Sequence, residues 1–354
     1  MAGVYVHIPF CKRRCLYCDF FSTTLLEQRE AYIAALLNEI QARKNEAGEP
    51  VRTIYIGGGT PSVLDADAIA RIVKSIGTED AEEITMELNP GDATPAYLRS
   101  IRQAGINRLS IGIQSFQDEL LRLIGRRHNA AQAIEAVHMA QEAGWDNLSI
   151  DLMYALPTQT MDMWQADIET ALSLNVQHIS SYGLIYEPGT ALTRLRDSGQ
   201  LQPVDEETEN DMYDELCARL QQAGFVHYEV SNFALPGYEA KHNSRYWDGT
   251  PYIGVGAGAH SYIPPVRSWN TDDLEAYLHG NPARESETLS PTDLYNERIM
   301  LGLRTNRGIE ADIIRADITP QLEAHLLRRT PDGRVVATQS GIHILNRIIE
   351  DLMI

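Results

Sequence analysis

The chain has 354 residues, which suits one α/β barrel with a small second domain better than three independent domains. Hydrophobic residues make up 44% of the chain and charged residues 22%, as in globular proteins with a sizeable core. The net charge of −19 argues against nucleic acid or an anionic lipid surface as the partner. No apolar run reaches the roughly 18–20 residues of a membrane span, and the first residues lack the pattern of a signal peptide. We therefore expect a cytoplasmic protein that is not integral to a membrane.

Strand-like and helix-like patterns alternate through the first two thirds of the chain. Six strands are expected at residues 4–8, 53–56, 84–88, 108–113, 148–152 and 178–182. Helical apolar spacing fills the intervals between them, for example over residues 30–44. This alternation predicts a parallel sheet with right-handed crossovers, closed into a partial (β/α)6 barrel. Loops rich in glycine and proline follow the strands, where a barrel carries its functional residues.

Beyond Gly189 the alternation stops. A helix at 205–223 and a strand at 226–230 precede a stretch rich in glycine, tyrosine and tryptophan that shows little periodicity. Helical patterns return from about residue 290. The sequence therefore predicts three parts: a core barrel at 1–235, a connecting segment with a β extension at 236–285, and a small, mainly helical C-terminal domain at 286–354.

Three of the four cysteines lie within eight residues, on the loop that follows the first strand. Cys11, Cys15 and Cys18 form a C-x3-C-x2-C run, whereas Cys217 lies alone in an amphipathic helix and is expected to pack as a small apolar residue. Three thiolates can hold three irons of a [4Fe–4S] cluster and leave the fourth iron open to a ligand. A zinc site is the alternative, but it needs a fourth ligand nearby, and His7 lies in awkward geometry for that role. The spacing favours the open cluster.

The cysteine run resembles that of the radical S-adenosylmethionine (SAM) proteins. In that superfamily the open iron binds the amino and carboxylate groups of SAM, and the reduced cluster cleaves SAM to a 5′-deoxyadenosyl radical. The resemblance extends over nearly the whole chain to the group of oxygen-independent coproporphyrinogen III oxidases (HemN). It rests on residues 5–11 (YVHIPFC), 57–61 (GGGTP), 114–116 (QSF) and 151–157 (DLMYALP).

This resemblance implies a set of cofactor-binding residues. The SAM site it implies consists of Tyr17, Gly58, Gly59, Thr60, Glu87, Gln114, Arg126 and Asp151, with Tyr5 stacked near the cluster. Glycines let the backbone approach a ligand closely, and their N–H groups can bind its carboxylate. Glu87 suits the ammonium group of SAM, and Asp151 suits the ribose hydroxyls. Without the resemblance, a tight turn at the glycines and a helix-cap role for each carboxylate remain open.

The chain departs from the oxidases at two places. Phe20 occupies the position where they carry a further cysteine, and only three residues precede Val4, where they have a substrate-binding segment. Both departures are typical of the HemW group, haem-binding chaperones related to the oxidases. We therefore expect no conversion of coproporphyrinogen III to protoporphyrinogen IX.

Residues 242–247 contain an H-N-x-x-Y-W run that resembles a haem-linked motif of the HemW group. An imidazole can bind haem iron, and aromatic rings offer flat apolar area to a macrocycle. The resemblance makes His242 the first candidate iron ligand, with Tyr246 and Trp247 lining the macrocycle and His260 as the second candidate. A purely packing role for these residues is the alternative.

Two functions follow from these patterns. In the first, the protein is a chaperone that binds haem and transfers it to client haemoproteins, respiratory-chain enzymes among them, and holds a [4Fe–4S] cluster and SAM. In the second, it is an oxidative decarboxylase of coproporphyrinogen III. Phe20 and the H-N-x-x-Y-W run favour the first. The resemblance also allows a homodimer, and the sequence identifies neither the haem donor nor the client.

Overall fold

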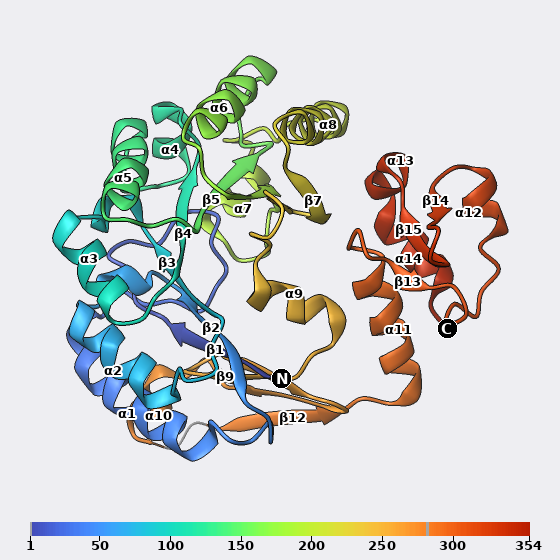
Figure 1. Ribbon diagram of the computed structural model, residues 1–354. Coiled ribbons are helices and arrows are strands. Elements are labelled where there is room, and N and C mark those ends of the chain that lie inside the picture. Colours follow the sequence, from blue (N-terminus) through green and yellow to red (C-terminus); the bar gives the residue numbers. More distant parts are fainter. Residues whose placement is uncertain (1, 281–282) are drawn as a thin grey trace.

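The computed structural model describes residues 2–280 and 283–354, and one curved sheet of twelve strands dominates it (Figure 1). Six neighbouring strands of this sheet are parallel and follow the order of the chain. They are β1 (Ala2–Ile8), β2 (Val51–Gly58), β3 (Glu83–Leu88), β4 (Arg108–Gln114), β5 (Leu148–Tyr154) and β6 (His178–Gly183). The predicted partial (β/α)6 barrel is confirmed.

Helices cover the outer face of these strands (Figure 1). They are α1 (Arg29–Arg43), α2 (Ala66–Ile76), α3 (Pro95–Gln103), α4 (Asp118–Leu123), α5 (Ala130–Glu142) and α6 (Met161–Ser173). Several begin at a side-chain cap, such as Asp65 before α2 and Thr160 before α6, which satisfies a free backbone N–H. Strand alternation sends Val4 and Val6 into the apolar core with the helices, whereas Tyr5 faces the inside of the barrel. None of the helices within the described ranges is both long and apolar enough to cross a bilayer.

Shorter strands extend the sheet at both edges. On one side β9 (Tyr252–Val255) pairs in parallel with β1, followed by antiparallel β10 (His260–Ile263), β11 (Val266–Asn270) and β12 (Arg284–Thr288). On the other side β8 (Asn232–Ala234) and β7 (Val226–Glu229) follow β6. The segment 236–285 supplies β9, β10 and β11 of the main sheet, in keeping with the β extension expected there. Strands of four or five residues are too short to show a clear period in the sequence.

The short helix α9 (Lys241–Asp248) packs at the end of the barrel where the parallel strands begin. It touches Thr53 of β2 and Glu83 of β3, both near the first residue of their strands. The loops after the strands lie at the opposite end. Helices α7 (Ala191–Asp197), α8 (Glu206–Gln222) and α10 (Leu274–Leu278) complete this part of the molecule.

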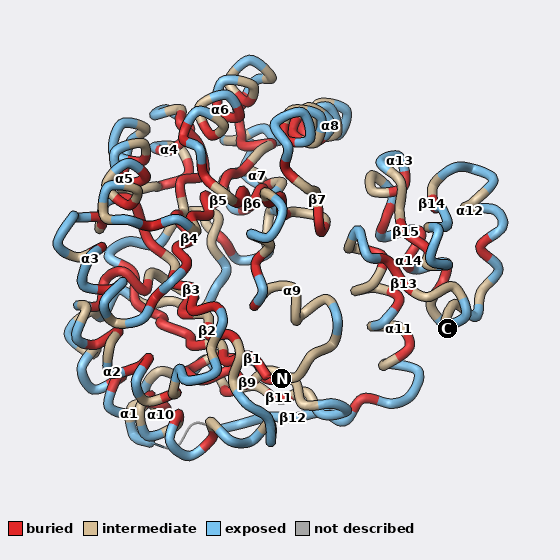
Figure 2. The backbone as a smooth tube through the Cα atoms, in the orientation of Figure 1, coloured by how far each residue is buried: buried red, intermediate tan, exposed pale blue. Residues whose placement is uncertain are grey.

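Residues 291–354 form a body with its own apolar core, which includes Ile299, Val335 and Leu352. Figure 2 shows the buried stretches of its backbone in red. Its elements are α11 (Pro291–Gly302), β13 (Ile309–Glu310), α12 (Thr319–Glu323), β14 (Leu327–Arg329), β15 (Arg334–Ala337), α13 (Gln339–His343) and α14 (Leu345–Leu352). Three of these are strands of a small sheet, so the body is less purely helical than expected. Its attachment to the barrel includes a backbone hydrogen bond from Val230 N–H to the Arg304 carbonyl, 2.9 Å.

Candidate functional site

The cysteine loop lies directly after β1, at the end of the barrel where the parallel strands finish. Backbone hydrogen bonds hold its base: Cys11 N–H donates to the Thr23 carbonyl at 2.8 Å, and Thr23 N–H donates to the Pro9 carbonyl at 2.7 Å. Leu16 N–H reaches the Ile124 carbonyl at 3.0 Å, which ties the loop to the segment after α4. The loop is therefore fixed at both ends by elements far apart in the sequence.

A buried aspartate that the sequence analysis missed also anchors this loop. The side chain of Asp92, only 3% exposed, accepts from Lys12 Nζ at 2.7 Å and from Arg127 Nη2 at 2.9 Å. Ser62 donates a further hydrogen bond to it at 2.9 Å. Although burial opposes it, the net effect of these partners is to lower the pKa of Asp92. The aspartate therefore stays ionised, and its ion pair with Lys12 ties the cysteine loop to the segment that follows β3.

The surroundings of the thiols fit an iron–sulfur cluster. Across residues 2–280 and 283–354 no three histidine, cysteine or acidic side chains are already grouped as metal ligands, so the fit is judged from the chemistry of the loop. The Thr60 hydroxyl donates to Cys11 Sγ at 3.3 Å, and Arg126 Nη1 lies 3.6 Å from Cys15 Sγ. Burial raises the pKa of Cys11, and that of Cys18 to about 11, so metal binding must displace thiol protons. An anionic, thiolate-bound cluster would be stabilised by these donors.

The glycine run at the end of β2 leaves no room for side chains. A Cβ at Gly59 would lie 3.0 Å from Cys11 Sγ, and one at Gly58 would lie 2.6 Å from the His7 ring. Gly58 also has a φ of +113°, which residues with a Cβ rarely adopt. The backbone at the end of β2 thus passes directly beside the cysteine loop.

Glu87 lies at the end of β3 and points to the same place. It accepts from the Tyr55 hydroxyl at 2.9 Å and from Gly58 N–H at 3.1 Å. Burial and the charge of Asp151 raise the pKa of Glu87 to about 7. Tyr55 is a second residue that sequence reasoning missed, although the alternation of β2 places it on the inner face of the barrel.

Three further predicted SAM residues meet around Gly112 of β4. A Cβ there would lie 3.0 Å from Gln114 Nε2, 3.2 Å from Arg126 Nη2 and 4.0 Å from Asp151 Oδ2. Gln114 has a φ of +75°, and the register between β4 and β5 shifts at this point. This irregular strand end turns the amide of Gln114 toward the guanidinium and the carboxylate.

Glu87 and Asp151 are two buried carboxylates that a positively charged ligand would stabilise. Burial raises the pKa of Asp151 even though Ser110 donates to it at 3.0 Å. The buried guanidinium of Arg126 donates to the Gly112 carbonyl, while its Nε has no hydrogen-bond partner. A ligand with both cationic groups and hydrogen-bonding oxygens would satisfy these atoms. SAM has a sulfonium, an ammonium, a carboxylate and ribose hydroxyls.

The remaining residues implied for the SAM site, Tyr17 and Tyr5, border this centre: Tyr17 interacts with Arg126 and Cys15, and Tyr5 lies near Glu87. Tyr17 packs on the apolar cluster of Leu120 and Ile124, and burial raises its pKa. The Tyr5 ring stacks on Tyr55 with ring centres 6.2 Å apart, and its hydroxyl lies 3.0 Å from His7 Nδ1. The structure therefore places Tyr5 inside the barrel.

His242, the first candidate iron ligand of the sequence analysis, is enclosed within the fold. The residue is 1% exposed, at the end of the barrel opposite the cysteine loop. Its Nδ1 lies 3.0 Å from Thr53 Oγ1 and its Nε2 lies 2.9 Å from the Tyr246 hydroxyl, so both ring nitrogens have partners. Burial and the charge of Arg245 lower the pKa of His242 to about 3. In this conformation the imidazole joins α9 to β2, and its role as an iron ligand stays a prediction.

Glu83 shows why α9 packs here. Its carboxylate accepts from the backbone N–H of Lys241 at 2.9 Å and of His242 at 2.8 Å. These are the first residues of α9, where backbone N–H groups lack helical partners. Glu83, the first residue of β3, therefore caps the N-terminus of α9. Single-sequence reasoning gave no signal for this, because the two segments lie 158 residues apart.

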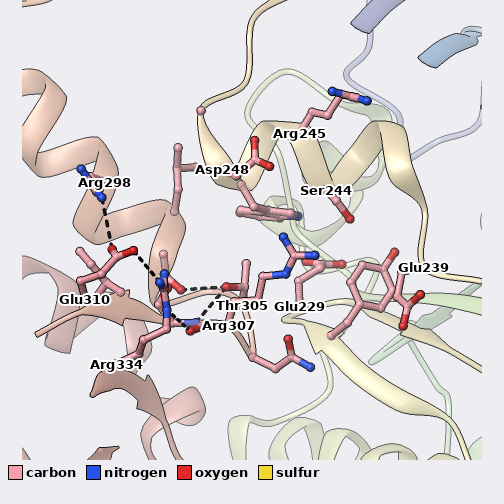
Figure 3. A pocket seen from close by; sticks show the side chains of 18 of the residues that line it. Glu229, Glu239, Ser244, Arg245, Asp248, Arg298, Thr305, Arg307, Glu310 and Arg334 are labelled. Carbon is pink, nitrogen blue, oxygen red and sulfur yellow. Dashed lines mark hydrogen bonds and ion pairs between the residues drawn. The ribbon is translucent and has the colours of Figure 1, made fainter. Parts of the chain in front are cut away.

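Trp247 faces a different space from Tyr246. It lines a cleft of about 1280 Å³ between α9 and the C-terminal body, shown in Figure 3. Charged side chains cover much of its wall, including Glu310, which pairs with Arg298 at 3.2 Å and Arg334 at 2.5 Å. Tyr246 and Trp247 thus line different cavities, and their predicted contact with one macrocycle stays a prediction.

Comparisons with known proteins agree with this geometry. Residues 5–171 match the model of the Radical SAM superfamily. The proteins named heme chaperone HemW from Lactococcus lactis and Bacillus subtilis are 41% and 37% identical, each covering 87% of this chain, and the chain spans 82% and 85% of their lengths. The structure of coproporphyrinogen III oxidase (HemN) from Escherichia coli superposes with a TM-score of 0.82 at 25% identity, over 99% of this chain and 90% of that one.

The barrel, the cysteine loop and the family match define a radical SAM protein, a class that implies a [4Fe–4S] cluster and SAM as cofactors. Within that class the relatives are more specific. Their identity and coverage are sufficient to establish kinship over most of the chain. The chain belongs to the HemW family.

Proposed function

We propose that this protein is a haem chaperone, which binds haem and transfers it to client haemoproteins. The observation that supports this most directly is the 41% identity, over 87% of the chain, to a protein named heme chaperone HemW. A second support is an aromatic cavity of about 650 Å³ beside the cysteine loop, within the size range of small-molecule and cofactor sites. Respiratory-chain enzymes are among the clients we propose.

Cys11, Cys15 and Cys18 would hold the cluster, and the strand ends would hold SAM. In this proposal the glycine run of β2 receives the amino-acid part of SAM, Glu87 accepts from its ammonium group, and Asp151 accepts from its ribose. The cluster supplies one-electron chemistry when it is bound. Thr60 and Arg126, which lie beside two of the thiols, would stabilise its negative charge.

The alternative function, oxidative decarboxylation of coproporphyrinogen III, is supported by the overall similarity to HemN. Phe20 stands where the oxidases carry a further cysteine, and the relatives named HemW are more similar to this chain than the HemN structure is. We therefore expect no multiple-turnover formation of protoporphyrinogen IX in an anaerobic assay.

Haem titration of the anaerobically reconstituted protein tests the proposal. Saturable binding of one haem per chain should give a shifted Soret band, and mixing with apomyoglobin should then move the haem to myoglobin. Serum albumin loaded with haem is the control for passive release. Absence of saturable binding, or transfer no faster than from albumin, would overturn the chaperone function. Light scattering of the same sample measures whether the protein is a homodimer.

A further inference from the structure

A cavity of about 650 Å³ lies beside the segment that directly follows Cys18. Its other wall is the inner face of β9–β11, the strands added next to β1. Aromatic side chains from both walls surround it: Tyr5, Phe20, Phe21, Tyr246, Tyr252 and Trp269. The cavity is therefore rich in aromatic side chains, which offer apolar area to a planar ligand.

Phe20 is unusually exposed for an aromatic residue, with 65% of its surface accessible to solvent. It stands at one wall of the cavity, two residues after the last cysteine of the loop. An occupant that covers Phe20 would remove this apolar area from water and gain binding free energy. The cleft of Figure 3 offers no comparable aromatic wall, because charged side chains cover much of it.

His260 also lines this cavity, at the first position of β10. It lies opposite Trp269 of β11 in the strand register, and the two rings stack with centres 5.7 Å apart and planes 20° apart. Among the described residues, none forms a hydrogen bond with either of its ring nitrogens. Burial and the charge of Arg267 lower the pKa of His260, so its imidazole is neutral at neutral pH and has a lone pair for a metal.

The other histidine at this cavity is not available in the same way. His7 is 4% exposed, its Nδ1 lies 3.0 Å from the Tyr5 hydroxyl, and its Nε2 lies 2.9 Å from the Phe21 carbonyl. His242 is also fully engaged, through Thr53 and Tyr246. Of these three imidazoles, only that of His260 combines exposure to a cavity with unbonded ring nitrogens.

We propose that haem binds in this cavity, with His260 as the iron ligand and Trp269 as the ring that holds the imidazole in place. This inference rests on the proposed haem-binding function and names the site of the cargo. Three carboxylates also line the cavity, from Asp19, Asp272 and Glu285. They would repel anionic propionates, so the aromatic walls and the imidazole would have to supply the binding free energy.

The test is haem titration of the full-length reconstituted protein and three variants, followed by absorption and electron paramagnetic resonance spectra. His260→Ala should weaken haem binding at least tenfold and change both the Soret band and the ferric haem resonance, and added imidazole should restore the wild-type spectrum. Trp269→Leu should keep the wild-type spectrum but weaken binding several-fold. His279→Ala is the matched control, because His279 is an exposed histidine at the end of α10. Iron and sulfide content should be equal in all four proteins.

The outcomes separate the two proposals. If wild-type protein binds haem and His260→Ala binds it with the same affinity and spectrum, the ligand assignment is wrong while the chaperone function stands. If the wild-type protein itself shows no saturable haem binding, the chaperone function fails, and the site with it. Loss of binding in His279→Ala to the same extent as in His260→Ala would also overturn the assignment.

Discussion

The two ends of the barrel contain similar residue types in opposite states. Where the parallel strands finish, Glu87 and Asp151 are buried carboxylates with raised pKa values, and the Nε of Arg126 has no partner. Where the strands begin, Glu83 and His242 are equally buried, but the protein itself provides hydrogen-bond partners for the Glu83 carboxylate and for both ring nitrogens of His242. At the first end two raised carboxylate pKa values and the unpartnered Nε of Arg126 favour a bound ligand, whereas Glu83 and His242 at the other end are engaged within the protein.

The same contrast separates two histidines. His242 belongs to the motif that first suggests haem, yet its ring is a structural bridge between α9 and β2. His260 lies in a glycine-rich stretch without an obvious motif, yet it faces an aromatic cavity next to the cysteine loop. The hydrogen-bond partners of each histidine, more than its place in a motif, decide whether its ring nitrogens are available to a ligand.

Removing a cysteine of the loop should have the largest effect. Cys11→Ala should abolish the cluster, which in the wild-type protein amounts to about four irons and four sulfides per chain. Iron and acid-labile sulfide analysis after anaerobic reconstitution measures this. Cys217→Ala is the control and should keep the full iron and sulfide content, because Cys217 belongs to α8 and packs against the core. Stoichiometric zinc in protein prepared without oxygen would show that the loop holds a different metal.

The structural role of His242 predicts a large loss of stability. His242→Ala removes two hydrogen bonds, leaves the Thr53 hydroxyl without a partner and opens a cavity, so the free energy of unfolding should fall by about 2–4 kcal/mol. Urea denaturation measures it, with His279→Ala as a control expected to change by under about 0.5 kcal/mol. If His242→Ala left the unfolding midpoint unchanged but abolished the haem spectrum, His242 would be a haem ligand and not a structural residue.

At the ligand end, the raised pKa of Glu87 predicts pH-dependent SAM binding. The ammonium group needs the ionised carboxylate, so below the pKa of about 7 each binding event must release a proton. The dissociation constant should rise about tenfold for each pH unit below 7.

Calorimetry on the clustered protein between pH 6 and 8.5 measures this dependence. Glu87→Gln should flatten the curve and weaken SAM binding about 10–100-fold at pH 8, from the loss of a hydrogen bond between charged groups. Glu79→Gln, at an exposed glutamate, is the control. A pH-dependent curve in Glu87→Gln would assign the proton to another group.

The smallest effect is expected at the cap of α9. Glu83→Gln leaves one acceptor for two backbone N–H groups and removes the charge at the helix start, so stability should fall by about 1–2 kcal/mol. Glu82→Gln changes the neighbouring, exposed residue, whose ion pairs with Arg52 and Lys241 lie on the surface and should contribute under about 1 kcal/mol. Equal losses in both variants would show that the cap adds nothing beyond surface charge.

The sequence by itself determined the barrel, the cysteine loop and most of the strand-end residues around it. These features are local: apolar periodicity sets each strand and helix, and a C-x3-C-x2-C run lies within eight residues. Because parallel strands finish at one edge of a sheet, the sequence predicts that Gly58, Glu87, Gln114 and Asp151 lie close together.

Only the tertiary structure decided the roles of the histidines and the place of residues 236–285. Strand β9 joins β1 across about 250 residues of chain, and Glu83 caps a helix that begins 158 residues later. Whether an imidazole is engaged or free depends on such distant partners, Thr53 and Tyr246 for His242 and only a stacked ring for His260. Periodicity and spacing report neighbours along the chain, whereas hydrogen-bond satisfaction is set by neighbours in space.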